Sequence, residues 1–203
     1  MKLNKGLPGE TPLDDYSGLK QKWIKNISDR ARAELENNLK AFRKYLLRTP
    51  TKRMAPFSAE WMIRVHFQMF ADVWTWAGEI RRTVKNIGVK PVLIRLDLEE
   101  LARDIEYWRS GQWADGFEQG VHIHHRAVKI HPFEDGNGRW ARLLANIWLK
   151  QNGLPIISWP DIGPLASKSQ TRRQYIQAIK IADKGNLIPL IKLHEKYSLT
   201  DAI

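Results

Sequence analysis

The chain has 203 residues, of which 43% are hydrophobic and nine are tryptophan, enough to fill the core of one compact domain and too apolar for an intrinsically disordered protein. No stretch approaches the roughly 18 consecutive apolar residues of a membrane-spanning helix, and the N-terminus has no apolar segment typical of a secretory signal. The lack of cysteine excludes disulfides and thiolate metal sites. These features predict a cytoplasmic protein that does not bind membranes.

Basic side chains outnumber acidic ones, because 33 Lys and Arg oppose 22 Asp and Glu and give a net charge of +11. Residues 1–53 contain 13 basic and 6 acidic side chains and so carry +7 of this total. Such a positive field attracts nucleic acid, nucleotides or an acidic partner. A basic surface that serves only solubility is the simpler alternative.

The hydrophobic periodicity predicts an all-α fold with one short β-hairpin. Residues 1–18 contain the Pro and Gly pairs of an extended arm. An amphipathic helix begins at Ser28 and stops before Thr49, and a second helix follows Ser58. The apolar face predicted for the first helix consists of Ala31, Leu35, Leu39, Phe42 and Leu46.

The segment 83–94 has spaced β-branched residues around a glycine and a proline, which is typical of a short hairpin or an extended flap. Asp97 is predicted to cap the helix that follows it. The next helix must end at Ile130 or His131, because the residue before a proline is disfavoured in the helical region. Further helices are predicted at 139–152, 169–184 and 187–197.

The turn after His131 has the composition of an anion-binding site. It reads His131-Pro-Phe-Glu-Asp-Gly-Asn-Gly-Arg139-Trp-Ala-Arg142. Gly136 and Gly138 permit positive φ and a close approach of a ligand to the backbone, and Asn137 tolerates the same conformations. The N–H groups of this turn and of the next helix then converge on one point, where a helix N-terminus favours negative charge.

Charged and titratable side chains surround this turn. Arg139 and Arg142 lie three residues apart on the first turn of the helix, so both can hold phosphate oxygens. Their charges oppose the helix dipole by about 0.3–1 kcal/mol each, and a bound polyphosphate would remove that conflict. Asp135 is a hard oxygen ligand suited to Mg²⁺ on phosphates, and His131 can accept a proton near neutral pH.

The segment resembles the signature of the Fic family, His-x-Phe-x-Asp/Glu-Gly-Asn-Gly-Arg-x-x-Arg, at every specified position. Further similarity lies at 73–81 and 175–189, so the resemblance covers roughly residues 55–195, and 85–89 is similar to the subgroup called mobile mystery protein B. It implies a Fic-like helical bundle with a β-hairpin flap over the active site. It also implies Mg²⁺-dependent transfer of AMP from ATP to a Tyr, Thr or Ser hydroxyl of a protein target.

The resemblance implies a role for each residue of the site. His131 would be the general base, Asp135 would hold Mg²⁺ on the α- and β-phosphates, and Phe133 would anchor the loop in the core. The other nucleotide contacts fall to Gly136, Asn137 and Gly138 at the α-phosphate, Arg139 and Arg142 at the β- and γ-phosphates, and Tyr175 and Asp183 at adenosine. The flap would align the target as an added strand through Asn86, Ile87, Gly88 and Val89.

The N-terminal region, residues 1–54, is expected to regulate the core at 55–203. Many family members carry an inhibitory helix with the pattern Ser/Thr-x-x-x-Glu-Gly/Asn, whose Glu pairs with the second arginine of the signature. Glu36 and Asn37 match the end of this pattern, whereas Arg32 stands in place of Ser or Thr. The resemblance thus suggests a Glu36–Arg142 pair. The alternative is an ordinary surface pair of Glu36 with Lys40. The partners expected of a toxin-like protein are a separate antitoxin chain or a second copy of itself, and restraint is then absent or comes from the antitoxin.

Three alternatives compete with AMP transfer. A Fic-type enzyme can transfer UMP, phosphocholine or phosphate instead. A metal-dependent hydrolase would use the four histidines crowded into ten residues, which are His122, His124, His125 and His131. A basic nucleic-acid-binding module without catalysis would explain the charge, although the sequence has no known reading motif.

Overall fold

The computed structural model describes residues 17–111, 113, 115–159 and 170–199, and the predicted arm lies outside this part except at its last two residues. Seven α-helices and one short 3-10 helix make up the described fold, in the order α1 (Ile27–Leu46), α2 (Ala59–Phe70), η1 (Pro91–Leu93), α3 (Ile94–Arg109), α4 (Gly116–Ile130), α5 (Asn137–Gln151), α6 (Gln170–Ala182) and α7 (Ile188–Lys196). The described residues form two isolated β-bridges and no sheet. The all-α class is therefore confirmed.

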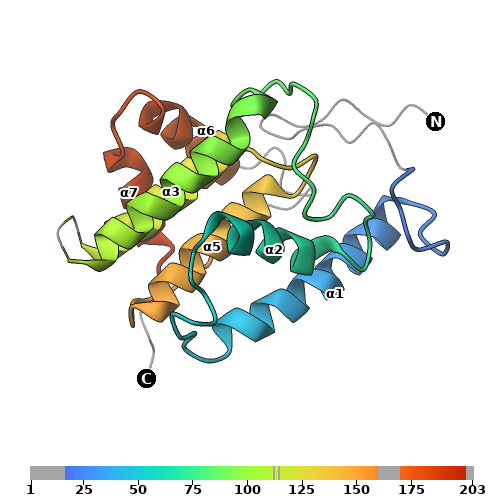
Figure 1. The fold of residues 1–203 in the computed structure, drawn as a ribbon, viewed down its shortest axis with the longest axis horizontal. Helices are drawn as coiled ribbons and strands as arrows, with labels where there is room; N and C mark the ends of the chain where they lie inside the picture. The colour runs from blue at the N-terminus through green and yellow to red at the C-terminus, as the bar shows by residue number, and fades with distance from the viewer. Residues whose placement is uncertain (1–16, 112, 114, 160–169, 200–203) are drawn as a thin grey trace.

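Helices α4 and α5 pack against each other at the centre of the molecule (Figure 1). Helices α1 and α2 lie together on one side of this pair, and α6 and α7 lie on the opposite side. Helix α3 crosses the molecule in contact with α2 and α4. The tight turn between α4 and α5, which carries the glycine-rich motif, is thus held by the most closely packed part of the fold. No helix of the described chain has the length and apolarity that crossing a bilayer requires.

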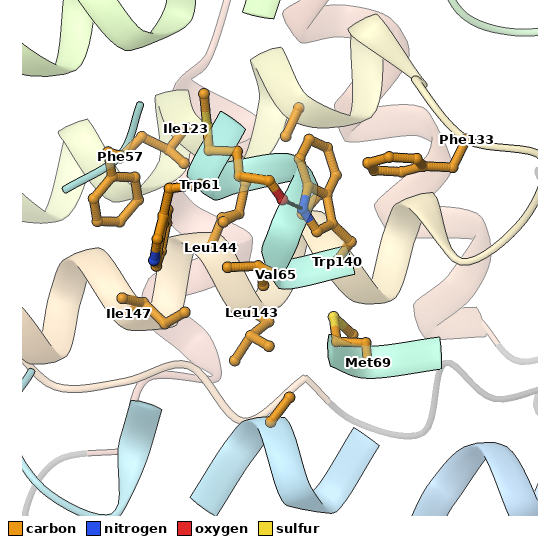
Figure 2. Packing of buried hydrophobic residues seen from close by; sticks show 14 of the residues in the cluster. Phe57, Trp61, Val65, Met69, Ile123, Phe133, Trp140, Leu143, Leu144 and Ile147 are labelled. Carbon is orange, nitrogen blue, oxygen red and sulfur yellow. Dashed lines mark hydrogen bonds between the residues drawn. The ribbon is translucent and has the colours of Figure 1, made fainter. Parts of the chain in front are cut away.

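Large side chains from α2 and α5 fill the core between these two helices. Figure 2 shows Trp61, Val65 and Met69 facing Leu143, Leu144 and Ile147. Trp140 is fully buried beside them, and its indole Nε1 donates a hydrogen bond of 2.7 Å to the carbonyl of Met62. Such a buried aromatic residue with a satisfied N–H fixes the start of α5 against α2.

Helix boundaries follow local signals that the sequence contains. Ser58 caps α2, where its hydroxyl accepts from the N–H of Trp61, and α4 ends at Ile130 as predicted. Helix α4 begins at Gly116, because Asp115 caps it by accepting from the N–H groups of Phe117 and Glu118 at 2.8 Å each. Carboxylate caps of this kind typically stabilise a helix by about 1 kcal/mol.

The apolar face predicted for α1 is wrong. Leu35 and Leu39 are 58% and 42% exposed, and Ala31 is exposed too, while Phe42 and Leu46 are only partly buried. The face that packs on the core holds three small or aromatic residues and three polar ones, which are Ala33, Glu34, Asn37, Asn38, Ala41 and Tyr45. The alanines let α1 approach closely. The N-cap is Asn26, which accepts from the N–H of Asp29, so the helix starts before Ser28.

Polar side chains on this face of α1 bond to the end of α2. The amide of Asn37 donates to the carbonyl of Gln68 at 3.1 Å and accepts from the N–H of Asp72 at 2.9 Å. The hydroxyl of Tyr45 bonds to the side chain of Gln68 at 2.8 Å. These contacts satisfy groups that the end of α2 leaves unpaired, so a polar face is the one that α1 needs to bury.

The predicted β-hairpin does not form. Residues 83–90 are irregular, and Pro91 begins a 3-10 turn that leads into α3 at Ile94. Asp97 therefore lies inside the first turn of α3 and is not its cap. Proline cannot donate to a strand ladder, and the carbonyls of Thr83 and Val89 accept from the Arg81 side chain.

Candidate active site

His131 ends α4 in a conformation that few non-glycine residues adopt. Its backbone is left-handed, with φ 51° and ψ 60°, and its N–H bonds to the carbonyl of Ala127. The side chain is buried, and Nδ1 lies 3.3 Å from the carbonyl of Val128. Because a carbonyl only accepts, Nδ1 carries the proton and Nε2 is the basic ring nitrogen.

Burial lowers the pKa of His131 to about 4. The hydrogen bond to Val128 raises the pKa, and the charges of Arg81 and Lys85 lower it further, but burial is the largest effect. The ring is therefore neutral at pH 7. A neutral imidazole can accept a proton from a substrate hydroxyl.

The loop after His131 is closed by the side chain of Asn137. Its Oδ1 accepts from the N–H of Phe133 at 2.9 Å, and its Nδ2 donates to the carbonyl of the same residue at 2.8 Å. Phe133 is fully buried, stacked on His66 and edge-on to Trp140. The Asn137 amide is thus occupied within the loop, and the residue offers a bound anion its backbone N–H.

Gly136 has both the conformation and the space of an obligatory glycine. Its φ is 80°, and a Cβ atom there would lie 2.5 Å from the ring of Phe70 and 3.2 Å from Nε2 of His66. Its N–H bonds to Oδ1 of Asp135 at 2.6 Å. As the N-cap of α5 it has no capping side chain, so the first N–H groups of α5, from Asn137 onward, have no side-chain cap, which is the arrangement that favours an anion at a helix N-terminus.

The two arginines of the signature lie in different surroundings. Arg139 forms an ion pair with Glu34, lies 3.6 Å from Asp135 and stacks over Phe70. Arg142 is partly buried beneath Gly138, where a Cβ atom would come within 3.4 Å of its guanidinium. Its charge acts on the neighbouring Tyr175, where it opposes the rise that burial gives to the pKa of the phenol.

Glu34, and not Glu36, is the α1 carboxylate that reaches the site. Its side chain is buried, accepts from the indole of Trp74 at 2.9 Å, and lies 3.8 Å from Arg30 as well as against Arg139. Burial alone would raise the pKa of Glu34, but these cationic and N–H partners outweigh it and lower the pKa overall. Glu36 is exposed, because two residues along a helix is about 200° of rotation.

His66 is a second buried residue of the site that sequence reasoning missed. Its Nδ1 accepts from the N–H of Gly78 at 3.0 Å, so its Nε2–H donates to the carbonyl of Asp135 at 3.0 Å. Burial lowers the pKa of His66 to about 3. The neutral ring therefore fixes the peptide that precedes the glycine turn.

Arg81 is the third missed residue. It is 2% exposed, and its guanidinium donates to the carbonyls of His131 (2.7 Å), Thr83 (2.7 Å) and Val89. Its own N–H bonds to the carbonyl of Pro132. One side chain thus ties both ends of the segment 83–89 to the backbone of His131.

Arg81→Lys is expected to lower the free energy of unfolding by about 1–3 kcal/mol. The ammonium group of lysine cannot donate to all three carbonyls at once, so at least one buried carbonyl is left unpaired. Urea denaturation followed by circular dichroism measures this. The neighbouring Arg82 is exposed, so Arg82→Lys is a matched control that should change stability by less than about 0.5 kcal/mol. Equal effects of the two variants would contradict the assigned role.

The predicted flap residues lie beside His131. Gly88 has φ 95°, and a Cβ atom on it would come within 2.5 Å of Cβ of His131. The N–H of Val89 bonds to the carbonyl of Ile130 at 3.3 Å, whereas Asn86 is exposed and Ile87 is half-buried. An ion pair from Lys85 to Glu134 holds the segment on the motif loop.

The remaining candidates separate into two groups. Tyr175 reaches the site through Arg142, but Asp183 lies against α4, where its carboxylate bonds to Nε2 of His125 at 2.9 Å. His122 packs against Trp113 with ring centroids 4.6 Å apart. Among the described residues there is no group of three or more His, Asp or Glu that could hold a metal ion, so the hydrolase hypothesis gains no support.

This helical architecture, with a histidine before an anion-binding helix N-terminus, agrees with the comparisons. Residues 56–149 match the Fic/DOC family model, and the chain contains a Fic domain. It is 35% identical over 125 residues to the protein adenylyltransferase fic-1 of Caenorhabditis briggsae and 32% identical over 118 residues to the protein adenylyltransferase Fic of Drosophila grimshawi. These alignments cover 60% and 57% of this chain and 23% of each relative.

Solved structures show the same fold. A fragment of Fic-1 from C. elegans, residues 134–508, superposes with a TM-score of 0.67 at 25% identity, over 87% of this chain and 51% of that one. The BepC protein of Bartonella tribocorum, solved with bound AMPPNP, superposes with a TM-score of 0.66 at 19% identity, over 90% and 92% of the two chains. The assignment to the mobile mystery protein B subgroup stays a prediction.

Proposed function

We propose that the protein is a protein adenylyltransferase that transfers AMP from ATP to a hydroxyl of a protein target. The observation that carries this is the position of neutral His131 at the end of α4, joined by a short turn to the N-terminus of α5, whose first two turns carry Arg139 and Arg142. A base and a polyphosphate site are thereby adjacent. The adenylyltransferase relatives support the choice of AMP.

The chain's own residues account for the transfer. Nε2 of His131 accepts the proton of the target Tyr, Thr or Ser hydroxyl as its oxygen bonds to the α-phosphorus, and pyrophosphate leaves as the bond to the β-phosphate breaks. The N–H groups at the start of α5 stabilise the charge that develops on the α-phosphate. The two arginines hold the β- and γ-phosphates until pyrophosphate departs.

Asp135 is the residue that would hold Mg²⁺. It offers a single carboxylate, which suits an ion that takes its other ligands from phosphate oxygens and water. When bound, the ion would neutralise phosphate charge. The Asp135 carboxylate already lies between Gly136 and Arg139, at the end of the helix where the phosphates would bind.

The segment Asn86–Val89 would hold the target beside His131. It has no partner strand in the described chain, so a target segment would pair with its backbone as an added strand. An adjoining groove of about 360 Å³ is lined by Trp76, Ile80, Arg82 and Glu134 among others. Aromatic and charged walls there would select the residues that flank the acceptor hydroxyl.

Incubation with ATP labelled at the α- or the γ-phosphate, together with cell lysate, tests the proposal. Protein-bound label from the α-position alone is expected, and the His131→Ala chain serves as the control for label that does not depend on the base. Label from the γ-position would indicate phosphate transfer. Label from neither, with uptake from UTP or CDP-choline, would favour the other Fic-type transfers.

We further propose that α1 restrains the core of residues 55–203 through Glu34. The carboxylate neutralises Arg139, which is one of the two cations assigned to the β- and γ-phosphates, so Glu34 competes with ATP for it. In this proposal the inhibitory carboxylate is Glu34 in place of Glu36. Its partner is the first arginine of the signature, Arg139, in place of the second, Arg142.

Glu34→Gly is expected to raise self-modification with labelled ATP at least about tenfold, which corresponds to about 1.4 kcal/mol of competition removed. Glu36→Gly is the matched control, because it places the same helix-weakening glycine two residues away and leaves the Glu34–Arg139 pair intact. Equal activity of the two variants would contradict restraint by Glu34. Restraint would then be absent or come from a separate antitoxin chain.

A further inference from the structure

A continuous line of hydrogen bonds runs from Tyr175, which lies beside Arg142, through two buried histidines to α7. The hydroxyl of Tyr175 lies 3.2 Å from Nε2 of His124. Nδ1 of His124 lies 3.0 Å from Nε2 of His194, whose Nδ1 lies 2.8 Å from the carbonyl of Leu190. The line crosses from α6 to α4 and α7.

The carbonyl at its far end fixes the direction of every bond. The carbonyl of Leu190 only accepts, so His194 carries its proton on Nδ1 and accepts at Nε2. His124 must then donate from Nδ1 and accept at Nε2, which leaves the Tyr175 hydroxyl as the donor to His124. The oxygen of Tyr175 is thereby left to accept, and the guanidinium of the neighbouring Arg142 can only donate.

The two histidines have no access to solvent. Both are 0% exposed, and their rings lie 4.9 Å apart, with the ring of Trp159 about as close to each. Burial lowers the pKa of His124 well below its usual value and that of His194 to about 4. The charge of Arg142 lowers both pKa values further, and that of Arg172 acts on Tyr175. Both rings are neutral at pH 7, as the line of bonds requires.

We propose that His124 and His194 are positioning residues for ATP binding, which hold the Tyr175 hydroxyl so that its oxygen fixes the Arg142 guanidinium beside the N-terminus of α5. This rests on the proposed function, since Arg142 matters only if the site takes a polyphosphate. Two histidines that only filled space in the core would not require a particular tautomer of either ring. Here each ring nitrogen has a single compatible partner.

Long-range ¹H–¹⁵N spectra of the full chain test the line of bonds without any ligand. Both His124 and His194 are expected to show the neutral form protonated at Nδ1 at pH 7, each resonance being assigned by its loss in the His124→Gln or His194→Gln chain. A ring protonated at Nε2, or at both nitrogens, would overturn the inference.

ATP affinity, measured by calorimetry on the full chain, tests the positioning role. His124→Leu is expected to weaken ATP binding about tenfold and to raise KM for ATP in the transfer assay with little change in kcat. His124→Gln should restore binding to within about threefold, because an amide can both donate and accept. His122→Leu is the control for the loss of a packed histidine on the same helix, and it should leave the affinity unchanged.

Tyr175→Phe removes the link between the histidines and Arg142, so it should weaken ATP binding as much as His124→Leu does. The double variant should be no weaker than either single one, since residues of one network are not additive. Additive losses, or unchanged affinity in His124→Leu, would overturn the inference alone. Failure of the wild-type chain to bind ATP would overturn the proposed function, and the inference with it.

Discussion

Replacing His131 by alanine is expected to lower the rate of transfer to a protein target by about 10²–10⁴-fold, the usual effect of losing a positioned base. ATP affinity should change little, because Nε2 acts on the attacking hydroxyl and the phosphates are held by α5 and its arginines. The rate of labelling from α-labelled ATP and the calorimetric Kd for ATP measure the two effects separately.

Two features of the site sharpen this test. The left-handed backbone of His131 tolerates asparagine better than most residues, so His131→Asn keeps a polar side chain without a base of comparable strength. It should be as inactive as the alanine variant. Retention of more than roughly a tenth of the wild-type rate in either variant would refute the role of His131 as the base.

Acidification is expected to unfold the protein between about pH 6 and pH 4. Burial lowers the pKa of His66 to about 3 and the pKa values of His131 and His194 to about 4, whereas an unfolded chain has histidine pKa values near 6.5. Below that value the unfolded state binds more protons than the folded state. The stabilisation is therefore complete above about pH 6.5 and is lost as the pH falls towards the folded pKa values.

At pH 5 the protonation of each of these three histidines should lower the free energy of unfolding by about 2 kcal/mol. Together the three losses are comparable with the whole free energy of unfolding of an ordinary domain, ~5–15 kcal/mol. Urea denaturation at pH 7 and pH 5 measures the difference. His131→Asn removes one of these groups and should reduce the loss of stability between pH 7 and pH 5 by about 2 kcal/mol. Equal free energies of unfolding at the two pH values would show that these rings are not held neutral in the folded state.

The helices that surround the site are predictable because local signals define them. Ser58 caps α2, Pro132 ends α4, and Gly153, with φ 69°, follows α5. The same kind of reasoning fails at α1, where hydrophobicity favours a face with Leu35 and Leu39. The face that packs is chosen by close approach of alanines and by bonds to the end of α2, and no short-range pattern records either requirement.

The candidate site is predictable where one short segment supplies it and unpredictable where distant segments meet. The anion-binding turn and its arginines lie within twelve residues. Glu34 meets Arg139 across 105 positions of sequence, and His66 meets Asp135 across 69. Arg81 acts on backbone carbonyls, which have no sequence signature. The predicted hairpin is absent for the same reason. The Arg81 guanidinium binds the carbonyls of Thr83 and Val89, which a hairpin would pair across its two strands.

The bond between Glu34 and Trp74 has an optical consequence. Trp74 donates its indole N–H to the carboxylate that also holds Arg139, and its ring is stacked on Trp76 with centroids 4.9 Å apart. Any event that draws Glu34 away from Arg139 also changes the polar environment of the fully buried Trp74 and of the partly buried Trp76 stacked on it. Intrinsic tryptophan fluorescence therefore reports the release of α1 directly, with no label attached to the chain.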